Sequence, residues 1–337
     1  MTAESTTITP TAAHHRADGG FKNPWPDAEL HGFSDVLRWK LGDKRPKSIP
    51  PSPPYGSLPT KRSDVITPRA ARGYRSATWV GHSTVLLQLG TLNVLTDPVW
   101  SERASPFQWI GPRRIMPPAL DFDALPSIDV VLLSHNHYDH LDAPTVRRIA
   151  KRFPGAAWLC PLRLGALLTE LGVPYIIERD WWQPVETPEF SATCVPAQHF
   201  SARGVRDRGD TLWCGWTIAA DDVRVYFAGD TALHPEFGAI GEKTGPFDLV
   251  MLPIGAYNPR WFMRSVHMDP DDAMAAYRAV TSHQELKPPC MALHWGTFRL
   301  TDEAVEEPPA RFAELWRGAG FPTEANWTFA HGETRKL

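Results

Sequence analysis

One stretch decides the fold and the chemistry of this chain: Val130-Val-Leu-Leu-Ser-His135-Asn-His137-Tyr-Asp139-His140-Leu-Asp142. Its first four residues are apolar and predict a short buried strand. Three histidines and an aspartate then follow within six residues, too close together for one face of a strand or helix. Because neutral imidazole and carboxylate are good ligands for zinc and related ions, we expect a tight metal-binding loop. A solvated histidine-rich loop is the alternative.

Length and composition indicate a globular protein. The chain has 337 residues, of which 42% are hydrophobic and 22% charged, enough for a substantial core. Its net charge of −3 argues against a nucleic-acid partner. Four scattered cysteines without a C-x-x-C pair indicate reduced core thiols in a cytoplasmic protein. We expect neither a secretory signal nor a membrane span, while peripheral membrane contact and a homo-oligomer stay open.

The N-terminal part is expected to differ from the rest of the chain. Residues 1–20 are polar and predict a disordered tail, in which solvation is favoured over metal binding for the pair His14-His15. Residues 21–72 include the proline-rich stretch Pro46–Pro59, which can be neither a helix nor a central strand. We therefore expect an arm packed on the main domain rather than a free linker. Residues 73–337 are predicted to form the single main domain.

Ligand-type residues recur where other predicted strands end. Each of them follows a short apolar run, and they are Asp97, His199, Asp230 and His294. Helical segments alternate with the strands, and Asp142 and Asp269 are expected N-caps. This alternation predicts an α/β layered domain. Since strands of a layered sheet present their ends at one edge, these residues can converge on a single metal site with the loop His135–His140, called the histidine loop below.

These motifs resemble those of the metallo-β-lactamase superfamily. Ser134-His-Asn-His-Tyr-Asp-His140 matches the superfamily's H-x-H-x-D-H signature, and the other motifs follow in the family's order between about Thr78 and Phe298. Six local strings are similar to the branch that contains N-acyl-phosphatidylethanolamine-hydrolysing phospholipase D and its bacterial relatives. They are Trp79-Val-Gly-His-Ser-Thr84, Pro196-Ala-Gln-His199, Phe227-Ala-Gly-Asp-Thr231, Pro253-Ile-Gly-Ala-Tyr257, Pro259-Arg-Trp-Phe-Met263 and His294-Trp-Gly-Thr-Phe298. The resemblance implies a four-layer αββα sandwich.

The resemblance also implies a dinuclear centre. One ion would be held by His135, His137 and His199. The other would be held by Asp139, His140 and His294, with Asp230 bridging the two and Asp97 orienting a ligand histidine through its second ring nitrogen. The expected cofactors are two divalent ions, zinc first, with manganese or iron as alternatives.

Further residues are candidates for the reaction or for substrate contact. Asp139, Asp230 and His267 are the predicted catalytic residues; His267 matches a position that lies beside the metals in the phospholipase branch, and an ordinary loop histidine is the alternative. The predicted substrate contacts are His82, Trp109, Arg260 and Trp261. The tryptophans would either line an apolar groove for acyl chains or anchor loops by packing.

The expected chemistry follows from charge. A water between two divalent ions loses a proton near neutral pH, since a single zinc already lowers its pKa to about 7, and the hydroxide is the nucleophile. We therefore expect a metal-dependent hydrolase of a phosphodiester, such as an N-acylphosphatidylethanolamine-type phospholipid. One alternative is a lactonase or other carboxylic ester hydrolase on the same site. Another is a non-catalytic metal-binding scaffold.

Overall fold

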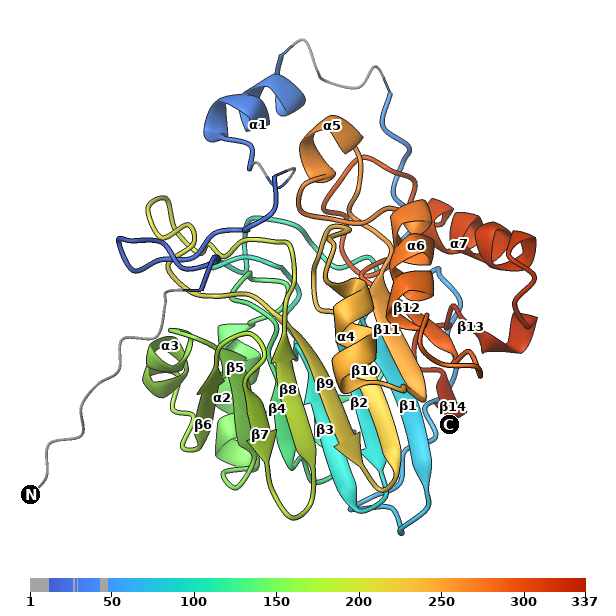
Figure 1. Cartoon of the computed structure of the whole chain (residues 1–337). Coiled ribbons are helices and arrows are strands. Elements are labelled where there is room, and N and C mark those ends of the chain that lie inside the picture. The colour runs from blue at the N-terminus through green and yellow to red at the C-terminus, as the bar shows by residue number, and fades with distance from the viewer. Residues whose placement is uncertain (1–11, 27, 29, 43–47) are drawn as a thin grey trace, which may run out of the picture.

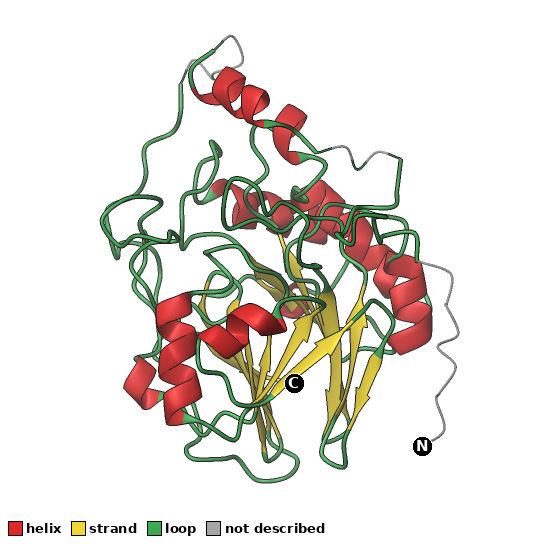
Figure 2. Ribbon diagram, turned by 90° about the vertical axis from the view of Figure 1, so that its left-hand side faces the viewer, coloured by secondary structure: helices red, strands yellow, loops and turns green. Residues whose placement is uncertain are grey.

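Two seven-stranded sheets stand face to face and are covered by helices on their outer sides (Figures 1 and 2). The structure is a computed structural model that describes residues 12–26, 28, 30–42 and 48–337. The first sheet has the strand order β14-β1-β2-β3-β4-β5-β6, and the second has the order β13-β12-β11-β10-β9-β8-β7. Both contain parallel and antiparallel pairs. The predicted four-layer αββα sandwich is therefore confirmed.

The first sheet contains the strand that leads into the histidine loop. Its strands are β1 Arg75–Gly81, β2 Thr84–Leu89, β3 Leu92–Thr96, β4 Val130–Leu132, β5 Ala157–Pro161, β6 Ile176–Arg179 and β14 Thr334–Lys336. β1, β2 and β3 form an antiparallel meander, and β3 to β6 run parallel to one another. β2 to β5 are buried along their whole length, because both faces of the sheet are covered.

The second sheet is built mainly from the C-terminal half of the chain. Its strands are β7 Pro184–Glu186, β8 Ser191–Val195, β9 Gly215–Ala220, β10 Val223–Phe227, β11 Leu249–Pro253, β12 Cys290–Leu293 and β13 Asn326–Trp327. The hairpin from β9 to β10 turns at Asp221 and Asp222, as the sequence predicts. Both residues have positive φ, 49° and 61°, which is the backbone of a two-residue hairpin loop that Asp tolerates.

Helices complete the outer layers. They are α1 Phe33–Lys40, α2 Ala143–Arg152, α3 Gly165–Glu170, α4 Phe237–Thr244, α5 Arg260–Met263, α6 Pro270–Val280 and α7 Glu307–Gly318, with short 3-10 turns at Phe122–Ala124 and Thr323–Ala325. Side chains of α2 and α3 pack on the first sheet, and those of α4, α6 and α7 pack on the second. Asp142 and Asp269 precede α2 and α6 as predicted, and the Asp269 side chain accepts a hydrogen bond from the Asp272 backbone.

Most of the bulky aromatic side chains belong to the core. The largest fully buried side chains include Trp79, Trp158, Trp213, Trp216 and Trp316. One apolar cluster fills the space between the sheets, and two others lie under the outer helices. The four cysteines are buried and unpaired. No helix within the described ranges is long and apolar enough to cross a membrane.

The N-terminal segment packs on the domain from residue 12 onward, where the sequence predicts a disordered tail through residue 20. Residues 1–11 lie outside the described residues. His14 is only 6% exposed, and Phe21 belongs to the cluster between the sheets. Local composition does not reveal this packing, because its partners, such as Trp181 and Gly209, are far away in the sequence.

Two further N-terminal pieces lie on the domain. α1 sits beside α5, above the ends of the strands, and the Trp39 ring is 5.2 Å from that of Phe262 (Figure 1). Of the proline-rich stretch Pro46–Pro59, residues 46 and 47 lie outside the described residues, and the part from 48 to 59 contains no helix or strand. That part contacts the domain through the Gly56 amide, which donates to the Ile115 carbonyl, and through the buried Leu58.

Candidate metal centre

The carboxyl ends of the central strands meet at one edge of the two sheets. β1, β3 and β4 point toward this edge in the first sheet, as do β8, β10, β11 and β12 in the second. The residues that follow these strands include His82, Asp97, the histidine loop, His199, Asp230 and His294. All lie in loops between buried strand ends, so two sheets contribute side chains to one place.

Asp230 lies at the middle of this arrangement. Its Oδ2 atom is 3.0 Å from His294 Nε2 and 3.1 Å from His140 Nε2. The same oxygen is 3.8 Å from His199 Nε2 and 4.0 Å from His135 Nε2. One carboxylate therefore faces two groups of histidines.

The first group consists of His135, His137 and His199, whose ligand atoms all lie within 4.8 Å of one another. His137 Nδ1 is 2.8 Å from His135 Nε2 and 3.2 Å from His199 Nε2. His199 Nδ1 lies 2.8 Å from the carbonyl oxygen of Val266, which can only accept a hydrogen bond. The ring proton of a neutral His199 is therefore on Nδ1, and the lone pair of Nε2 faces the centre.

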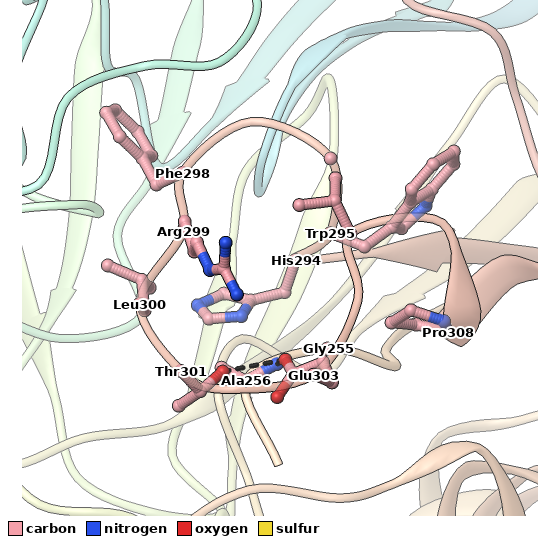
Figure 3. Close-up of a pocket in the computed structure, with 12 residues that line it drawn as sticks. Gly255, Ala256, His294, Trp295, Phe298, Arg299, Leu300, Thr301, Glu303 and Pro308 are labelled. Atoms are coloured by element: carbon pink, nitrogen blue, oxygen red, sulfur yellow. Dashed lines mark hydrogen bonds between the residues drawn. The ribbon is translucent and has the colours of Figure 1, made fainter. Parts of the chain in front are cut away.

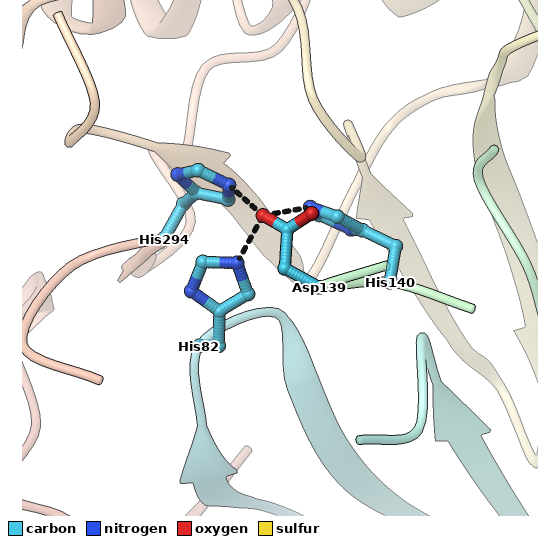
Figure 4. A group of neighbouring side chains, drawn as sticks. All are labelled: His82, Asp139, His140 and His294. Carbon is cyan, nitrogen blue, oxygen red and sulfur yellow. Dashed lines mark hydrogen bonds and ion pairs between the residues drawn. The ribbon is translucent and has the colours of Figure 1, made fainter. Parts of the chain in front are cut away.

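The second group surrounds Asp139 (Figure 4). Asp139 Oδ2 is 3.0 Å from His82 Nε2 and 3.5 Å from the Nε2 atoms of both His140 and His294. These four side chains also offer ligand atoms within 4.8 Å of one another. His82 thus contacts a predicted ligand. It is only 1% exposed, as buried as the predicted ligands around it, and the substrate contact that the sequence predicts for it stays a prediction.

Asp97 supports the centre from the first sheet. Its Oδ1 accepts a hydrogen bond from the Ser134 amide, and its Oδ2 accepts one from the Ser134 hydroxyl. Oδ2 also lies 2.6 Å from His140 Nδ1, which fixes the ring so that Nε2 points at Asp230. Ser134 was not among the predicted site residues. Its position directly before the histidine loop was the only sequence signal for it.

Burial sets the protonation state of the first group. It is the largest cause that lowers the pKa of His137 to about 3, that of His199 to about 4 and that of His135 well below 6.5. Burial, the largest single cause, would raise the pKa of both carboxyls, but the charge of His140 and the contacts of the surrounding histidines together outweigh it and hold the pKa of Asp139 and Asp230 well below the ordinary value. Neutral imidazoles and ionised carboxylates are the forms that bind metal.

Several buried atoms of the centre make no hydrogen bond of good geometry among the described residues, although two of them lie 3.0 and 3.1 Å from Asp230 Oδ2. They are His140 Nε2, His294 Nε2 and Asp230 Oδ1. Buried polar atoms are nearly always satisfied, so a group of them directed at one place requires something that the protein chain does not supply. A pair of divalent cations fits the donor set, which consists of five imidazoles and two carboxylates: His135, His137, Asp139, His140, His199, Asp230 and His294.

Two further predicted residues, His267 and Arg260, lie at different distances from the centre. His267 lies beside the centre, with Nδ1 4.0 Å from Asp230 Oδ2 and its ring 5.0 Å from that of His199. Arg260 donates to the His267 carbonyl at 2.9 Å and forms ion pairs with Asp269 and Asp272. The structure therefore places Arg260 as a support of the His267 loop rather than as a substrate contact.

The two predicted tryptophan contacts differ in their surroundings. Trp109 is 75% exposed and its ring lies 5.6 Å from that of Phe107, so the structure places it on an exposed loop. Trp261 lines a cleft of about 870 Å³ together with Arg264 and Leu233. Gln198, next to His199, and Ser265, near His267, line the same cleft. Trp261 therefore borders an opening beside the centre.

The loops around His294 are closely fitted (Figure 3). Glu303 accepts hydrogen bonds from the backbone amides of Ala256 and Asn258, at 2.8 and 3.0 Å, and joins the loop after β11 to the loop after β12. A Cβ atom on Gly255 would lie 2.2 Å from the His294 carbonyl oxygen. Only glycine fits there without moving the His294 backbone, which accounts for the glycine in the Pro253–Tyr257 motif.

Comparison with known proteins agrees with this geometry. Residues 92–295 match the beta-lactamase superfamily domain. The chain is 41% identical to an uncharacterized protein of Mycobacterium tuberculosis over 299 residues, which cover 87% of this chain and 77% of that protein. It is also 41% identical over 250 residues to an N-acyl-phosphatidylethanolamine-hydrolyzing phospholipase D of Caenorhabditis elegans, covering 71% of this chain and 69% of the relative.

A solved structure shows the same fold. A metallo hydrolase from the archaeon Ignicoccus hospitalis aligns with 78% of this chain and 98% of its own, with a TM-score of 0.56 at 22% identity. The family match, the close relatives and the shared fold agree with the resemblance that the histidine loop indicated. The chain belongs to the metallo-β-lactamase superfamily and is a metal-dependent hydrolase of that family.

Proposed function

We propose that this chain is a dinuclear phosphodiesterase that hydrolyses N-acylphosphatidylethanolamine-type phospholipids. One observation carries the dinuclear assignment: Asp230 Oδ2 lies 3.0 Å from His294 in one group and 3.8 Å from His199 in the other. A carboxylate in that position can bridge two ions. His135, His137 and His199 would hold one ion, and Asp139, His140 and His294 the other, with zinc the best match to the donors.

The ions would supply the electrophilic part of the chemistry. Two divalent ions lower the pKa of a water and offset the negative charge on a phosphoryl group during displacement at phosphorus. The chain's own residues fix the geometry. Asp97 contacts Nδ1 of the His140 ring, and the Val266 carbonyl contacts Nδ1 of the His199 ring. His82 contacts the Asp139 carboxylate through Nε2. These contacts set the donor atoms before any ion binds.

His267 is the side chain best placed to contact the reacting phosphoryl group. Burial holds its pKa well below the ordinary value, so the ring is neutral, and its buried Nδ1 has no hydrogen-bond partner among the described residues. A neutral imidazole donates one hydrogen bond, which suits a phosphoryl oxygen. Arg260 fixes the backbone of this residue through its carbonyl. We therefore assign substrate positioning to His267 and support of His267 to Arg260.

The cleft beside the centre combines apolar walls with one guanidinium. Leu30, Leu233 and Trp261 are apolar, and Arg264 offers a group that binds phosphate well. Two carboxylates also line the cleft, Asp35 and Asp272, and they contact His31 and Arg260. The Caenorhabditis elegans relative, 41% identical over 250 residues, is named for hydrolysing N-acyl-phosphatidylethanolamine. This similarity and the cleft support the proposed substrate class.

We also propose peripheral contact with a membrane. Phe107, Trp109 and Ile110 follow one another closely on one loop and are 54%, 75% and 52% exposed. Large apolar side chains that stay in water together often mark a contact surface, and a phospholipid substrate resides in a membrane. Sedimentation with phosphatidylethanolamine vesicles tests this. Trp109→Ser should weaken binding, and equal binding by both proteins would contradict it.

A panel of three substrates tests the catalytic proposal. The zinc- or manganese-loaded protein is given bis(p-nitrophenyl) phosphate, a lactone and an N-acylphosphatidylethanolamine. We expect cleavage of the two phosphodiesters, with the phospholipid giving N-acylethanolamine and phosphatidic acid. Hydrolysis of the lactone alone would replace the proposal with a lactonase. Inactivity on all three substrates with metal bound would favour a scaffold.

A further inference from the structure

A second cluster of metal-ligand side chains lies at the rim of the first sheet. Asp180 directly follows the edge strand β6, and His14 and His15 reach it from the N-terminal segment. His14 Nε2 is 2.7 Å from Asp180 Oδ1, and His15 Nε2 is 2.8 Å from Asp180 Oδ2. The three ligand atoms lie within 4.8 Å of one another. None of these residues belongs to the centre described above.

The two histidine rings are held in place by their surroundings. The His14 ring stacks on Trp181 at 4.1 Å and is 6% exposed. The His15 ring stands edge-on to Phe21 at 5.2 Å. Because these contacts already restrict the rotamers, little further side-chain entropy is lost when the rings bind a common partner.

The backbone that carries the two histidines is also fixed. It forms a small hairpin in which the Lys22 amide donates to the His14 carbonyl at 2.9 Å and the Arg16 amide donates to the Gly20 carbonyl at 2.7 Å. The Phe21 amide donates to Gly209 and attaches the hairpin to the domain. Two adjacent histidines on a fixed hairpin therefore face one carboxylate.

We infer that His14, His15 and Asp180 form a further divalent-cation site of the zinc type, separate from the catalytic centre. Two imidazoles and one carboxylate are a common protein donor set for zinc, with solvent completing a tetrahedral shell. To bind a cation through Nε2, each neutral ring carries its proton on Nδ1, so the contact with the carboxylate is replaced by a bond to the ion without a change in ring charge. His15, with 27% of its side chain accessible, leaves a route for the ion to enter.

An ion at this site fastens the N-terminal segment beside the catalytic centre. The Asn23 side-chain amide donates to the His199 carbonyl at 2.9 Å. Trp25 stacks on His234 at 4.7 Å, and Pro26 lines the cleft beside the centre. The segment thus runs from the His14-His15 pair to the backbone of a predicted metal ligand. The site's role is structural: it holds one wall of the cleft.

A metal count on matched variants tests the inference. Chelator-stripped protein is loaded with zinc, dialysed against buffered free zinc, and measured for zinc per chain. We expect His15→Gln and Asp180→Asn each to bind one ion fewer than wild type. His283→Gln removes an exposed histidine outside the cluster and should match wild type. The difference between variants is independent of how many ions the catalytic centre holds.

Proteolysis of the segment provides the second readout. Trypsin sites follow Arg16 and Lys22, and the hairpin that carries them must open for the chain to enter the protease, so cleavage should be faster when the segment detaches. If cleavage follows the detached population, zinc at about 100 times its dissociation constant slows it about a hundredfold. We expect this protection in wild type and His283→Gln and its loss in His15→Gln and Asp180→Asn. Equal zinc counts in all four proteins, or equal protection of all four, would overturn the inference. The cluster would then be only a pair of hydrogen bonds from His14 and His15 to Asp180.

Discussion

The catalytic centre and the His14-His15-Asp180 cluster use the same donor chemistry but support it differently. In the centre the donors follow strands of two sheets, and neighbours such as Asp97 fix the rings. In the peripheral cluster two donors sit on an N-terminal hairpin that is attached to the domain by contacts such as His14 on Trp181 and the Phe21 amide to the Gly209 carbonyl. Strand ends thus set the positions of the central donors, whereas the positions of the peripheral donors depend on a docked segment. Central substitutions should therefore change chemistry, and peripheral ones should change attachment of the segment.

Removing the central bridge should have the largest effect. Asp230→Asn replaces the carboxylate that faces both histidine groups. We expect activity to fall at least roughly a thousandfold, because metal ions contribute several kcal/mol to the transition state. The centre should also lose zinc, measured per chain, while the peripheral cluster keeps its ion.

The matched control is Asp222→Asn, in the exposed hairpin between β9 and β10. Its backbone has a φ of 61°, which Asn tolerates, so folding and activity should stay at the wild-type level. An Asp230→Asn protein that folds and remains fully active would refute the bridging role.

Removing support behind a central donor should have a smaller effect. Asp97→Asn weakens the contact that fixes His140 and disturbs the bonds from Ser134. Loss of such an outer contact typically costs about 10- to 100-fold in metal affinity or activity. Competition for zinc with a chelator measures it. Ser134→Ala, which keeps the Asp97 to His140 contact, should lose less, and unchanged zinc affinity in Asp97→Asn would show that the donors need no such support.

A substitution at His267 distinguishes a role in substrate contact from a role in metal binding. His267→Gln should lower kcat about tenfold, as expected for one lost hydrogen bond to the reacting group, and leave the zinc count unchanged. Steady-state rates on bis(p-nitrophenyl) phosphate and metal analysis of the same sample provide both values. Loss of an ion in this variant would make His267 a ligand, and an unchanged rate would make it an ordinary loop residue.

The smallest expected effect is on the pH dependence of the free energy of unfolding, through His234 beside the docked N-terminal segment. Burial lowers the pKa of His234, which stacks on Trp25, to about 3 from 6.5. As pH falls, His234 is therefore protonated in the unfolded chain at a higher pH than in the folded chain. Its contribution to the free energy of unfolding is complete well above pH 6.5 and declines toward pH 3. From pH 7 to pH 6 the loss is about 0.7 kcal/mol. Other buried histidines add to the pH dependence of the whole protein, so the difference between wild type and His234→Phe in urea unfolding at both pH values measures this loss. An unchanged pH dependence in His234→Phe would contradict it.

Sequence reasoning anticipated the fold and the convergence of ligand-type residues because both follow from local patterns. Apolar runs mark the strands, and His199, Asp230 and His294 come soon after them. The roles of His82 and Arg260 could not be predicted in the same way. Each depends on a partner that only the folded chain supplies, Asp139 for His82 and the acidic start of α6 for Arg260.

The packing of the N-terminal segment also depends on distant partners and could not be predicted from the local sequence. Its polar composition predicts disorder, yet His14 and Trp25 contact rings that are more than a hundred residues away in the sequence. Aromatic stacking and a shared carboxylate offset the entropy of ordering a polar segment, and neither can be read from a local window. Ser134 is not predicted for a related reason: a serine at the end of a strand is common, and its role depends on its bonds to Asp97 and on its hydroxyl, which lies 2.8 Å from His135 Nδ1.

The central claim is that Asp230 bridges two ions, and anomalous X-ray scattering from zinc-loaded crystals tests it most directly. The account predicts two strong peaks flanking the Asp230 carboxylate. One should lie among His135, His137 and His199, and the other among Asp139, His140 and His294. A single peak at this edge of the sheets, or two peaks of which neither contacts Asp230, would contradict it.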